Sequence, residues 1–473
     1  MASKWNLSSF FGKANYSWSD KYLVSATLRY DGTSRLSNHK WGFFPAFSAG
    51  WRLSQENFMD LGPNVNELKI RASWGQTGNQ QVPTYSTLAS FQNNIHHSNY
   101  AIDGSQESVS TGLVQTRVSN PNLNWELTTQ SGLGIDLEMF NNKLVITADY
   151  FYKTTDDLLI FAPIPITYGG TNDGVWINGG QMKNHGFELG SKYSGKTGNV
   201  FYNLGINYSF YKNELVTLNP GVSYLGIPGS TLHNVNSGQE ISRTLPGQPI
   251  GTFFGYDALG IFQSEEEIAA YGLQPAARPG DLKFRDVNGD GVINAQDRVA
   301  IGSPHPKAVI GFNTNIYYKG VDLSMFFNGS FGNEIYNWSK SKIMFFNQSA
   351  YNKSNRILDA WTPENTNTDI PRLSMDDPNE NIRPSSYYVE NASFLKLNNL
   401  QLGYNFPSGF IHNLELRIYA QATNLFTITN YSGMTPEIGL QNYSSDSRNL
   451  DIGVDRGVYP PSRTFLLGFN VQF

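Results

Sequence analysis

The chain has 473 residues, of which 15% are charged and 14% are aromatic, and it contains no cysteine. Without cysteine, disulfide frameworks and thiolate metal sites are excluded, and the net charge of −5 argues against a nucleic-acid partner, which favours a clustered basic face. No run of about 18 apolar residues is present, so a helical membrane protein is excluded, whereas a membrane β-barrel hides its apolar band in alternate residues.

Alternation of apolar and polar residues is the dominant pattern along the chain, and a period of two indicates strands with one apolar and one polar face. It is clear in segments 22–31, 68–74, 144–153 and 414–423. The polar faces of these segments carry charged residues, namely Arg29, Asp31, Lys69, Arg71, Asp149, Lys153, Glu415 and Arg417. The sequence predicts roughly fourteen strands, several of them about 10 residues long, a length that suits a tilted membrane strand.

Turn residues agree with a meander of hairpins. Asn141–Asn142 and Lys319–Gly320 each lie between two alternating runs and predict tight hairpins. The apolar register shifts at Asn398–Asn399, which predicts a β-bulge. Long polar segments interrupt the hairpins, and the expected long loops are 79–122, 162–181, 218–250, 263–306 and 338–391.

Short turns at one end of the strands and long loops at the other are typical of an outer-membrane β-barrel. The alternative is a pair of soluble β-sandwiches, which also alternate and also carry loops. The charged polar faces favour the barrel, because they suit a wet lumen while the opposite faces suit lipid. The last strand, 463–473, places Phe465, Leu467, Phe469, Val471 and Phe473 on one face, which we expect to face lipid.

Two local motifs need to be weighed. "GSKYSGKT" (190–197) matches a phosphate-binding loop letter for letter, but alternating runs on both sides predict a hairpin turn with no helix to supply the required N-terminus. The match is therefore interpreted as accidental.

No catalytic motif can be assembled from the sequence. The histidines are scattered except for His96 and His97, so we do not expect an enzyme.

"DVNGDGVINAQD" (286–297) has the spacing of an EF-hand calcium loop, with a glycine for the sharp turn at its sixth position, Gly291. Oxygen ligands at these offsets suit a hard cation of calcium's size. The candidate ligands are Asp286, Asn288, Asp290, Val292 through its backbone carbonyl, Asn294 and Asp297. We expect calcium to act as a structural brace on an extracellular loop, 263–306, although a loop held by Asx turns without metal remains the alternative.

Several blocks, in order along the chain, resemble the SusC/RagA-type TonB-dependent transporters. They are YLVSATLRYDGTSRL (22–36), WGFFPAFSAGWRLSQE (41–56), NPNLNWELTTQSGLGIDLEMFNNKLVITADYFYKTTDDLL (120–159), NGGQMKNHGFELG (178–190), GDLKFRDVNGDGVINAQDR (280–298), ASFLKLNNLQLGYNFP (392–407), LRIYAQATNLFTITNYSGMTPEI (416–438) and YPPSRTFLLGFNVQF (459–473).

This resemblance implies a transmembrane antiparallel β-barrel of about 22 strands with a plugged lumen in the bacterial outer membrane. It implies energised import of oligosaccharides or peptides, a SusD-like surface lipoprotein that acts as a lid, and an inner-membrane TonB complex. Residues 1–473 are similar to the C-terminal barrel portion only, so we expect a fragment, without plug, signal peptide or early strands. The remaining alternative is a secreted, calcium-braced β protein that binds glycans as an adhesin or binding module, with its apolar faces buried between two sheets.

Overall fold

The computed structural model describes residues 3–93, 99–101, 104, 109–164, 174–226, 240–346, 352–407, 414–439, 450 and 452–472. The chain divides into two compact units. The first comprises Met1–Ser194 with Tyr211–Tyr224, and the second comprises Gly195–Phe210 with Leu225–Phe473.

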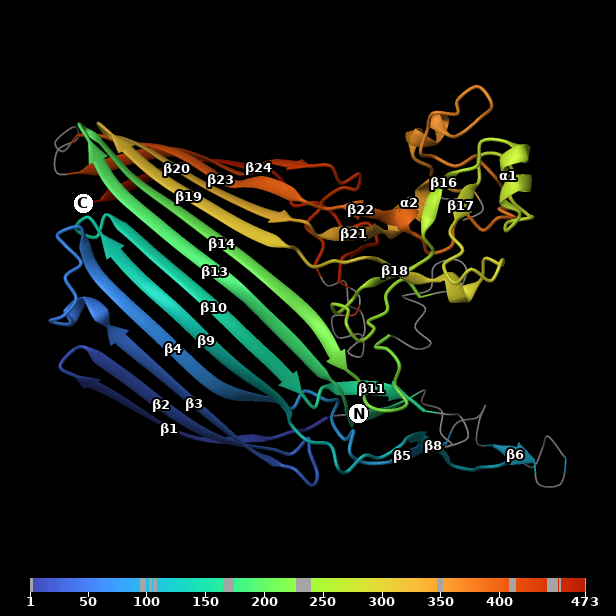
Figure 1. Ribbon diagram of the computed structural model, residues 1–473, viewed down its shortest axis with the longest axis horizontal. Helices are drawn as coiled ribbons and strands as arrows, with labels where there is room; N and C mark the ends of the chain where they lie inside the picture. The colour runs from blue at the N-terminus through green and yellow to red at the C-terminus, as the bar shows by residue number, and fades with distance from the viewer. Residues whose placement is uncertain are drawn as a thin grey trace. The chain divides into compact units, whose positions relative to one another are not determined.

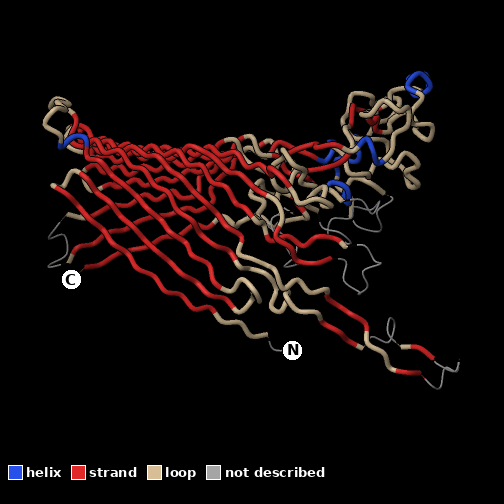
Figure 2. Tube along the Cα trace, turned by 60° about the horizontal axis from the view of Figure 1, so that its bottom comes forward, coloured by secondary structure: helices blue, strands red, loops and turns tan. Residues whose placement is uncertain are grey.

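A large antiparallel sheet dominates the fold, and helices are few and short (Figure 2). In the described residues it has thirteen strands, close to the roughly fourteen that the sequence predicts. In sheet order they are β1 (Leu7–Trp18), β2 (Tyr22–Thr33), β3 (Trp41–Arg52), β4 (Val65–Asn79), β9 (Glu126–Met139), β10 (Leu144–Asp156), β13 (Gln181–Thr197), β14 (Val200–Thr217), β19 (Ala308–Tyr318), β20 (Val321–Phe331), β23 (Phe394–Asn405), β24 (Glu415–Thr429) and β26 (Thr464–Gln472).

In the first unit, β1 to β4, β9, β10 and β13 lie side by side with short turns at one end and long connections at the other (Figure 1). The turn between β9 and β10 is Phe140–Lys143, and Asn141 and Asn142 adopt the left-handed φ values of 55° and 62° that such a turn requires. The connections at the opposite end, 80–125 and 157–180, are long, as predicted. The asymmetry expected of a barrel wall is therefore confirmed.

The predicted hairpin in the second unit is also confirmed. Lys319 and Gly320 alone join β19 to β20, with φ values of 45° and 89°. A Cβ at position 320 would lie 2.7 Å from the Asn405 carbonyl oxygen, so the turn requires glycine for space as well as conformation. The register of β23 against β24 shifts between Leu397 and Asn399, where the bulge was predicted.

Apolar side chains on one face of the sheet are exposed rather than packed against a second sheet. In β2, Val24 and Leu28 retain 50% and 47% of their accessible surface, and in β26 Phe465 and Leu467 retain 72% and 79%. The sandwich alternative required these faces to be buried, so it is wrong. Phe473, the terminal aromatic residue, lies outside the described residues.

Pairs of aromatic rings in contact lie at two levels on this exposed apolar face in the first unit. Trp18 and Tyr22 lie near the short turns with ring centroids 5.7 Å apart, and Tyr30 and Trp41 lie near the long connections with centroids 4.8 Å apart. Tyr22 and Tyr30 are separated by eight residues of β2, or about 26 Å at about 3.3 Å per residue. Because the strands of a membrane barrel tilt by about 35–45°, this length corresponds to a height of about 20 Å, which falls within the apolar band of about 25 Å that aromatic girdles flank.

Small sheets and short helices form the connections. The small sheets are β5 (Ser90–Gln92) with β8 (Val114–Arg117), β6 (Tyr100–Ala101) with β7 (Val109–Ser110), β11 (Leu159–Pro163) with β12 (Gly174–Asn178), β15 (Phe253–Gly255) with β18 (Val299–Gly302), β16 (Ala258–Ile261) with β17 (Leu282–Phe284), and β21 (Glu334–Asn337) with β22 (Val389–Asn391) and β25 (Val454–Asp455). Among the described residues, the α-helices are α1 (Glu265–Tyr271) and α2 (Trp338–Ile343), and the 3-10 helices are Leu53–Gln55, Ala295–Asp297, Asn355–Asp359 and Ser386–Tyr388.

Two loop predictions need correction. The loops expected at 218–250 and 263–306 are parts of one connection, 218–307, because the intervening strands β15 and β16 pair only within small sheets. A further long connection, 430–463, was not predicted. Its residues Tyr431 and Val454 are buried, because they pack into apolar clusters of the loop region.

Each unit has buried clusters in its connections rather than beneath the sheet. In the first unit the cluster consists of Leu36, Phe44, Val82, Leu123, Trp125, Leu159 and Trp176. In the second unit the largest consists of Ile241, Phe253, Tyr336, Met344, Phe345, Ala360, Ile370, Ile382, Tyr388 and Val454. The long loops are therefore packed structures in their own right.

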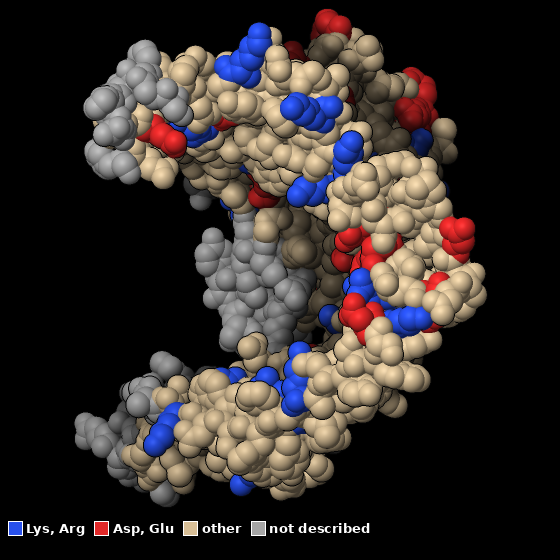
Figure 3. Space-filling view, turned by 90° about the vertical axis from the view of Figure 1, so that its left-hand side faces the viewer, with Lys and Arg blue, Asp and Glu red and all other residues tan. Residues whose placement is uncertain are grey.

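Charged residues are sparse on the surface. On the face drawn in Figure 3, they form small scattered groups among uncharged residues. No helix among the described residues is long and apolar enough to cross a membrane.

Candidate functional site

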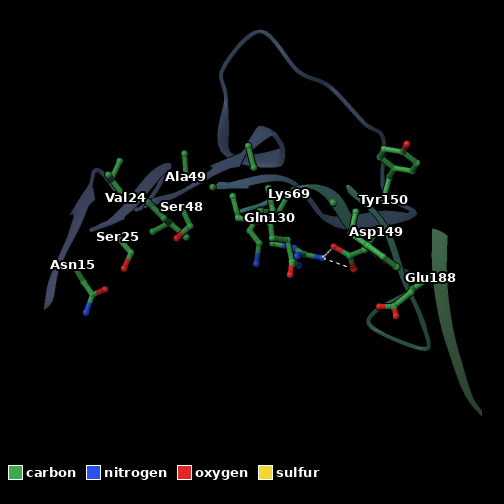
Figure 4. A pocket seen from close by; sticks show the side chains of 18 of the residues that line it. Asn15, Val24, Ser25, Ser48, Ala49, Lys69, Gln130, Asp149, Tyr150 and Glu188 are labelled. Atoms are coloured by element: carbon green, nitrogen blue, oxygen red, sulfur yellow. Dashed lines mark hydrogen bonds and ion pairs between the residues drawn. The ribbon is translucent and has the colours of Figure 1, made fainter. Parts of the chain in front are cut away.

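The polar face of the first unit carries a hollow of about 720 Å³. Its lining comes from β1, β2, β3, β4, β9, β10 and β13, so it extends across seven strands near the short-turn end of the sheet. Figure 4 shows Asn15, Ser25 and Ser48 pointing to the polar side, whereas Val24 and Ala49, their neighbours along the strands, point to the opposite side.

Small residues in register across neighbouring strands create the hollow. Ser25 faces Ser48, Ser48 faces Ser73, and Ser73 faces Gly132, so one row across four strands has no large side chain. Gly132 in turn faces Phe151 on β10, whose ring closes this row. Because facing residues in a sheet lie about 5 Å apart, the row forms a hydroxyl-lined floor that crosses the strands.

An ion-paired cluster borders this floor. The Arg71 guanidinium on β4 lies 2.8 Å from an Asp136 carboxylate oxygen on β9 and 2.9 Å from an Asp149 carboxylate oxygen on β10. Lys69 also pairs with Asp136, at 2.8 Å. Arg71 reaches across β9 because its facing residue there is Gly134, where a Cβ would lie 2.7 Å from the guanidinium Nη2. A side chain at position 134 would block the guanidinium, so the cluster requires glycine there.

The polar-face residues predicted from the sequence are only partly brought together. The hollow is lined by Lys69, Arg71, Asp149 and Lys153. Arg29 instead pairs with Asp31 at 2.7 Å, and Arg417, in the second unit, pairs with Asp322 at 2.6 Å. Glu415 is exposed at the start of β24.

Sequence reasoning did not identify the serine row, Asp136 or Glu188 as parts of a site. Alternation assigns Ser25 and Ser73 to the polar face, but their alignment depends on the register between strands, which a single sequence does not specify. Glu188 lies in "HGFELG", where alternation indicates its face but not its neighbour across the strand pair, Asp149.

The 286–297 loop adopts the sharp turns that its spacing predicts. Gly289 and Gly291 have φ values of 73° and 83°. The two Asp286 carboxylate oxygens accept hydrogen bonds from the Gly289 and Gly291 amides at 2.7 and 2.9 Å. In the same way Asn288 accepts from the Asp290 amide at 3.0 Å, and Asp290 accepts from the Val292 amide at 2.9 Å. This half of the loop is thus a series of Asx turns.

Asp297 is fully buried and closes the loop. Its carboxylate accepts hydrogen bonds from the Val287 and Asn294 amides at 2.9 and 2.7 Å, and Asn294 caps the 3-10 helix that contains it. Burial opposes ionisation of Asp297, but the amide hydrogen bonds outweigh it, so the pKa of the carboxyl lies below its usual range.

The candidate ligand atoms of this loop suit a hard cation, because they are carboxylate and amide oxygens, each with a second lone pair. Its arrangement does not yet form a coordination shell: within the described ranges, no group of three or more Asp, Glu or His side chains is placed to hold a metal ion. The six candidate ligands therefore stay a prediction.

The histidines form no site in the part of the chain that the structure describes. His96 and His97 lie outside the described residues. His305 lies in the connection before β19, where its Nε2 lies 2.8 Å from the Ile250 carbonyl oxygen. Burial lowers the pKa of this imidazole, although the hydrogen bond opposes the change.

Comparison with known proteins shows one family over most of the chain. The family described as "TonB dependent receptor-like, beta-barrel" matches residues 2–425. TonB-dependent receptor P3 of Formosa agariphila is 36% identical over 99% of this chain and 45% of its own length. TonB-dependent receptor SusC of Bacteroides thetaiotaomicron is 28% identical over 100% of this chain and 44% of its own length.

A solved structure shares the fold. The chain in "Structure of the RagAB peptide transporter" matches with a TM-score of 0.78 and 24% identity, over 98% of this chain and 47% of that one. The present chain thus spans about half the length of the proteins it matches.

Replacing Arg71 by Met is expected to destabilise the sheet by about 1 kcal/mol, because Asp149 loses its cation while Asp136 keeps Lys69. Urea unfolding in detergent measures the effect. The double variant Arg71→Met, Asp149→Asn should recover part of the loss. Equal stability of the Arg71→Met variant and the wild type would contradict a structural role for the cluster.

His305→Gln keeps a hydrogen-bond donor to Ile250 but does not titrate. Because the folded-state pKa of His305 is lowered, its contribution is fully present above its unfolded pKa, near 6.5, and is lost as pH falls through the folded value. The protection factors of the Ser303, His305 and Lys307 amides, which are corrected for the intrinsic pH dependence of exchange, should therefore fall between about pH 7 and pH 5 in the wild type and fall less in the variant. Parallel pH profiles would refute this.

Proposed function

Because the chain belongs to the TonB-dependent receptor-like β-barrel family, which places it in the bacterial outer membrane, we propose that it forms part of the wall of a TonB-dependent importer of oligosaccharides or peptides. The observation that carries this proposal is the two-sided character of the same strands. One face exposes Val24, Leu28 and Phe465, as lipid requires, while the other holds charges and a hydroxyl-lined hollow.

The polar face is suited to line a solute path. Charged groups in hydrocarbon are costly, whereas Arg71, Asp136 and Asp149 are mutually paired and half-exposed on the side away from the apolar band. The hollow beside them offers the hydroxyl groups of Ser25, Ser48 and Ser73 to a polar solute. The relatives are named as receptors, which supports transport rather than catalysis.

The long connections would face the cell exterior and contact solute and a SusD-like lipoprotein lid, and a TonB complex would supply energy. The support is the similarity to a protein named SusC and the shared fold with RagAB, a peptide importer solved in "open-open" and "closed-closed" states. For this chain both partners are proposals.

Calcium binding at Asp286, Asn288, Asp290, Val292, Asn294 and Asp297 is part of the proposal, as a brace for the 263–306 loop. It is supported by ligand spacing and by the left-handed turns at Gly289 and Gly291. When bound, calcium would offset two of the three negative charges that Asp286, Asp290 and Asp297 carry.

Transport is tested by uptake in cells of the source bacterium. Fluorescent oligosaccharides and peptides should accumulate in the wild type, and accumulation should stop when a protonophore removes the energy that TonB transmits. Deletion of the gene should remove the uptake, and reintroduction should restore it. Accumulation that survives the protonophore, or a protein recovered in the soluble secreted fraction, would reject the proposal.

Calcium is tested by hydrogen exchange with and without a chelator. Exchange at residues 286–297 should slow when calcium is added, and the double variant Asp286→Asn, Asp290→Asn should lose the response. Glu265→Gln, which alters a carboxylate of the same connection outside the loop, is the control and should respond as the wild type does. A calcium-independent exchange rate in the wild type would show that Asx turns alone hold the loop.

A further inference from the structure

The exposed apolar face of the second unit carries a groove of about 440 Å³, lined by residues of β23, β24 and β26. Ala420 and Ala422 on β24 form its floor. Each of them faces a leucine on β23, and on β26 they face Leu467 and Phe465. The floor is therefore lower than both walls, and the groove runs along β24.

This groove is complete within the chain. β24 is hydrogen-bonded to β23 on one side and to β26 on the other, so the floor and both walls come from three neighbouring strands. The wall residues Leu402, Phe465 and Leu467 are exposed. Because this is the face that meets lipid, the groove opens to hydrocarbon, and an apolar group must fill it.

The width of the groove limits what can enter it. Its walls stand on strands two positions apart in the sheet, which places their backbones about 9–10 Å from each other. The leucine and phenylalanine side chains of the walls narrow this space further. A helix with its side chains is about 10–12 Å wide, so a membrane helix does not fit between the walls. A single extended acyl chain does.

An arginine without a protein partner lies at one end of the groove. Arg463 precedes Phe465 by two residues, at the long-connection end of β26, and it is exposed. Its side chain forms no ion pair or hydrogen bond with any described residue. The backbone next to it is anchored to the floor strand, because the Asn424 side chain on β24 donates a hydrogen bond to the Ser462 carbonyl oxygen at 3.0 Å. The cation is therefore held close to the groove and is available to an anion.

We propose that the groove holds one acyl chain of a lipid whose phosphate headgroup binds Arg463, in the leaflet at the long-connection end of the wall. Lipid tails are as apolar as leucine, so the groove alone gains no hydrophobic energy over bulk lipid. The headgroup supplies the preference, because a cation near the membrane surface favours an anionic lipid by about 1 kcal/mol, or about fivefold. The inference requires the outer-membrane location of the chain but not transport.

The test is photolabelling of protein purified from the outer membrane and reconstituted in phosphatidylcholine vesicles. The probes are phosphatidylglycerol and phosphatidylcholine with the same diazirine-bearing acyl chain, each added in trace amounts. Mass spectrometry should locate label on the peptides that contain Ala420 and Leu467, with about fivefold more label from the phosphatidylglycerol probe. Elsewhere on the apolar face, the two probes should label the protein equally.

Two variants separate the headgroup from the groove. In Arg463→Gln the two probes should label the groove equally. In Ala420→Leu, which fills the exposed floor and keeps the arginine, labelling of the groove should fall to the level of the surrounding face. Arg278→Gln removes another exposed arginine of the second unit, and Ala148→Leu makes the same enlargement on β10. Both controls should behave as the wild type does.

Equal labelling of the groove by the two probes in the wild type would overturn the inference, as would a phosphatidylglycerol preference that persists in Arg463→Gln. Loss of the preference in inorganic phosphate, but not in chloride of equal ionic strength, would assign Arg463 to a soluble anion and reject the lipid. Because labelling needs no energised uptake, its outcome is independent of the proposed transport.

Discussion

The fold depends on one constraint: a backbone that faces hydrocarbon has no water to satisfy its N–H and C=O groups, so each strand must satisfy them through its neighbours. This explains the long, nearly unbroken registers of the sheet. β10 pairs with β13 over the whole of Leu144–Asp156, and with β9 over the same residues. Interruptions such as the bulge at Asn399 are single-residue shifts, after which pairing resumes.

The same constraint makes one face of the sheet apolar and leaves the polar and charged groups to the other. Since one face must be apolar, charged groups such as Arg71, Asp136 and Asp149 lie on the other, where strands only about 5 Å apart place like and unlike charges close together. Arg71 shows how this is resolved: one guanidinium bridges carboxylates on two further strands, β9 and β10, and Lys69 supplies the second positive charge. That arrangement requires Gly134 between them. A residue without a side chain is thus as important to the cluster as the charges themselves.

Much of this organisation follows from local sequence. Alternation correctly assigned Arg71 and Asp149 to the polar face, and the turn chemistry at Asn141–Asn142 and Lys319–Gly320 located two hairpins, because both depend on residues adjacent in the chain. The serine row did not follow, since Ser25, Ser48 and Ser73 come from three strands and meet only through register. The connection 218–307 was misjudged because the apolar run around Phe253 has the pattern of a wall strand but is buried against Tyr336 in a loop cluster.

The ion pairs of the polar face also limit what Arg71 can contribute to the binding of a ligand. Arg71 is already satisfied, so a ligand that engages it must compete with Asp136 and Asp149 and gains little. The cluster therefore acts as a fixed part of the wall, since its ion pairs join β4, β9 and β10 and leave no free charge on Arg71.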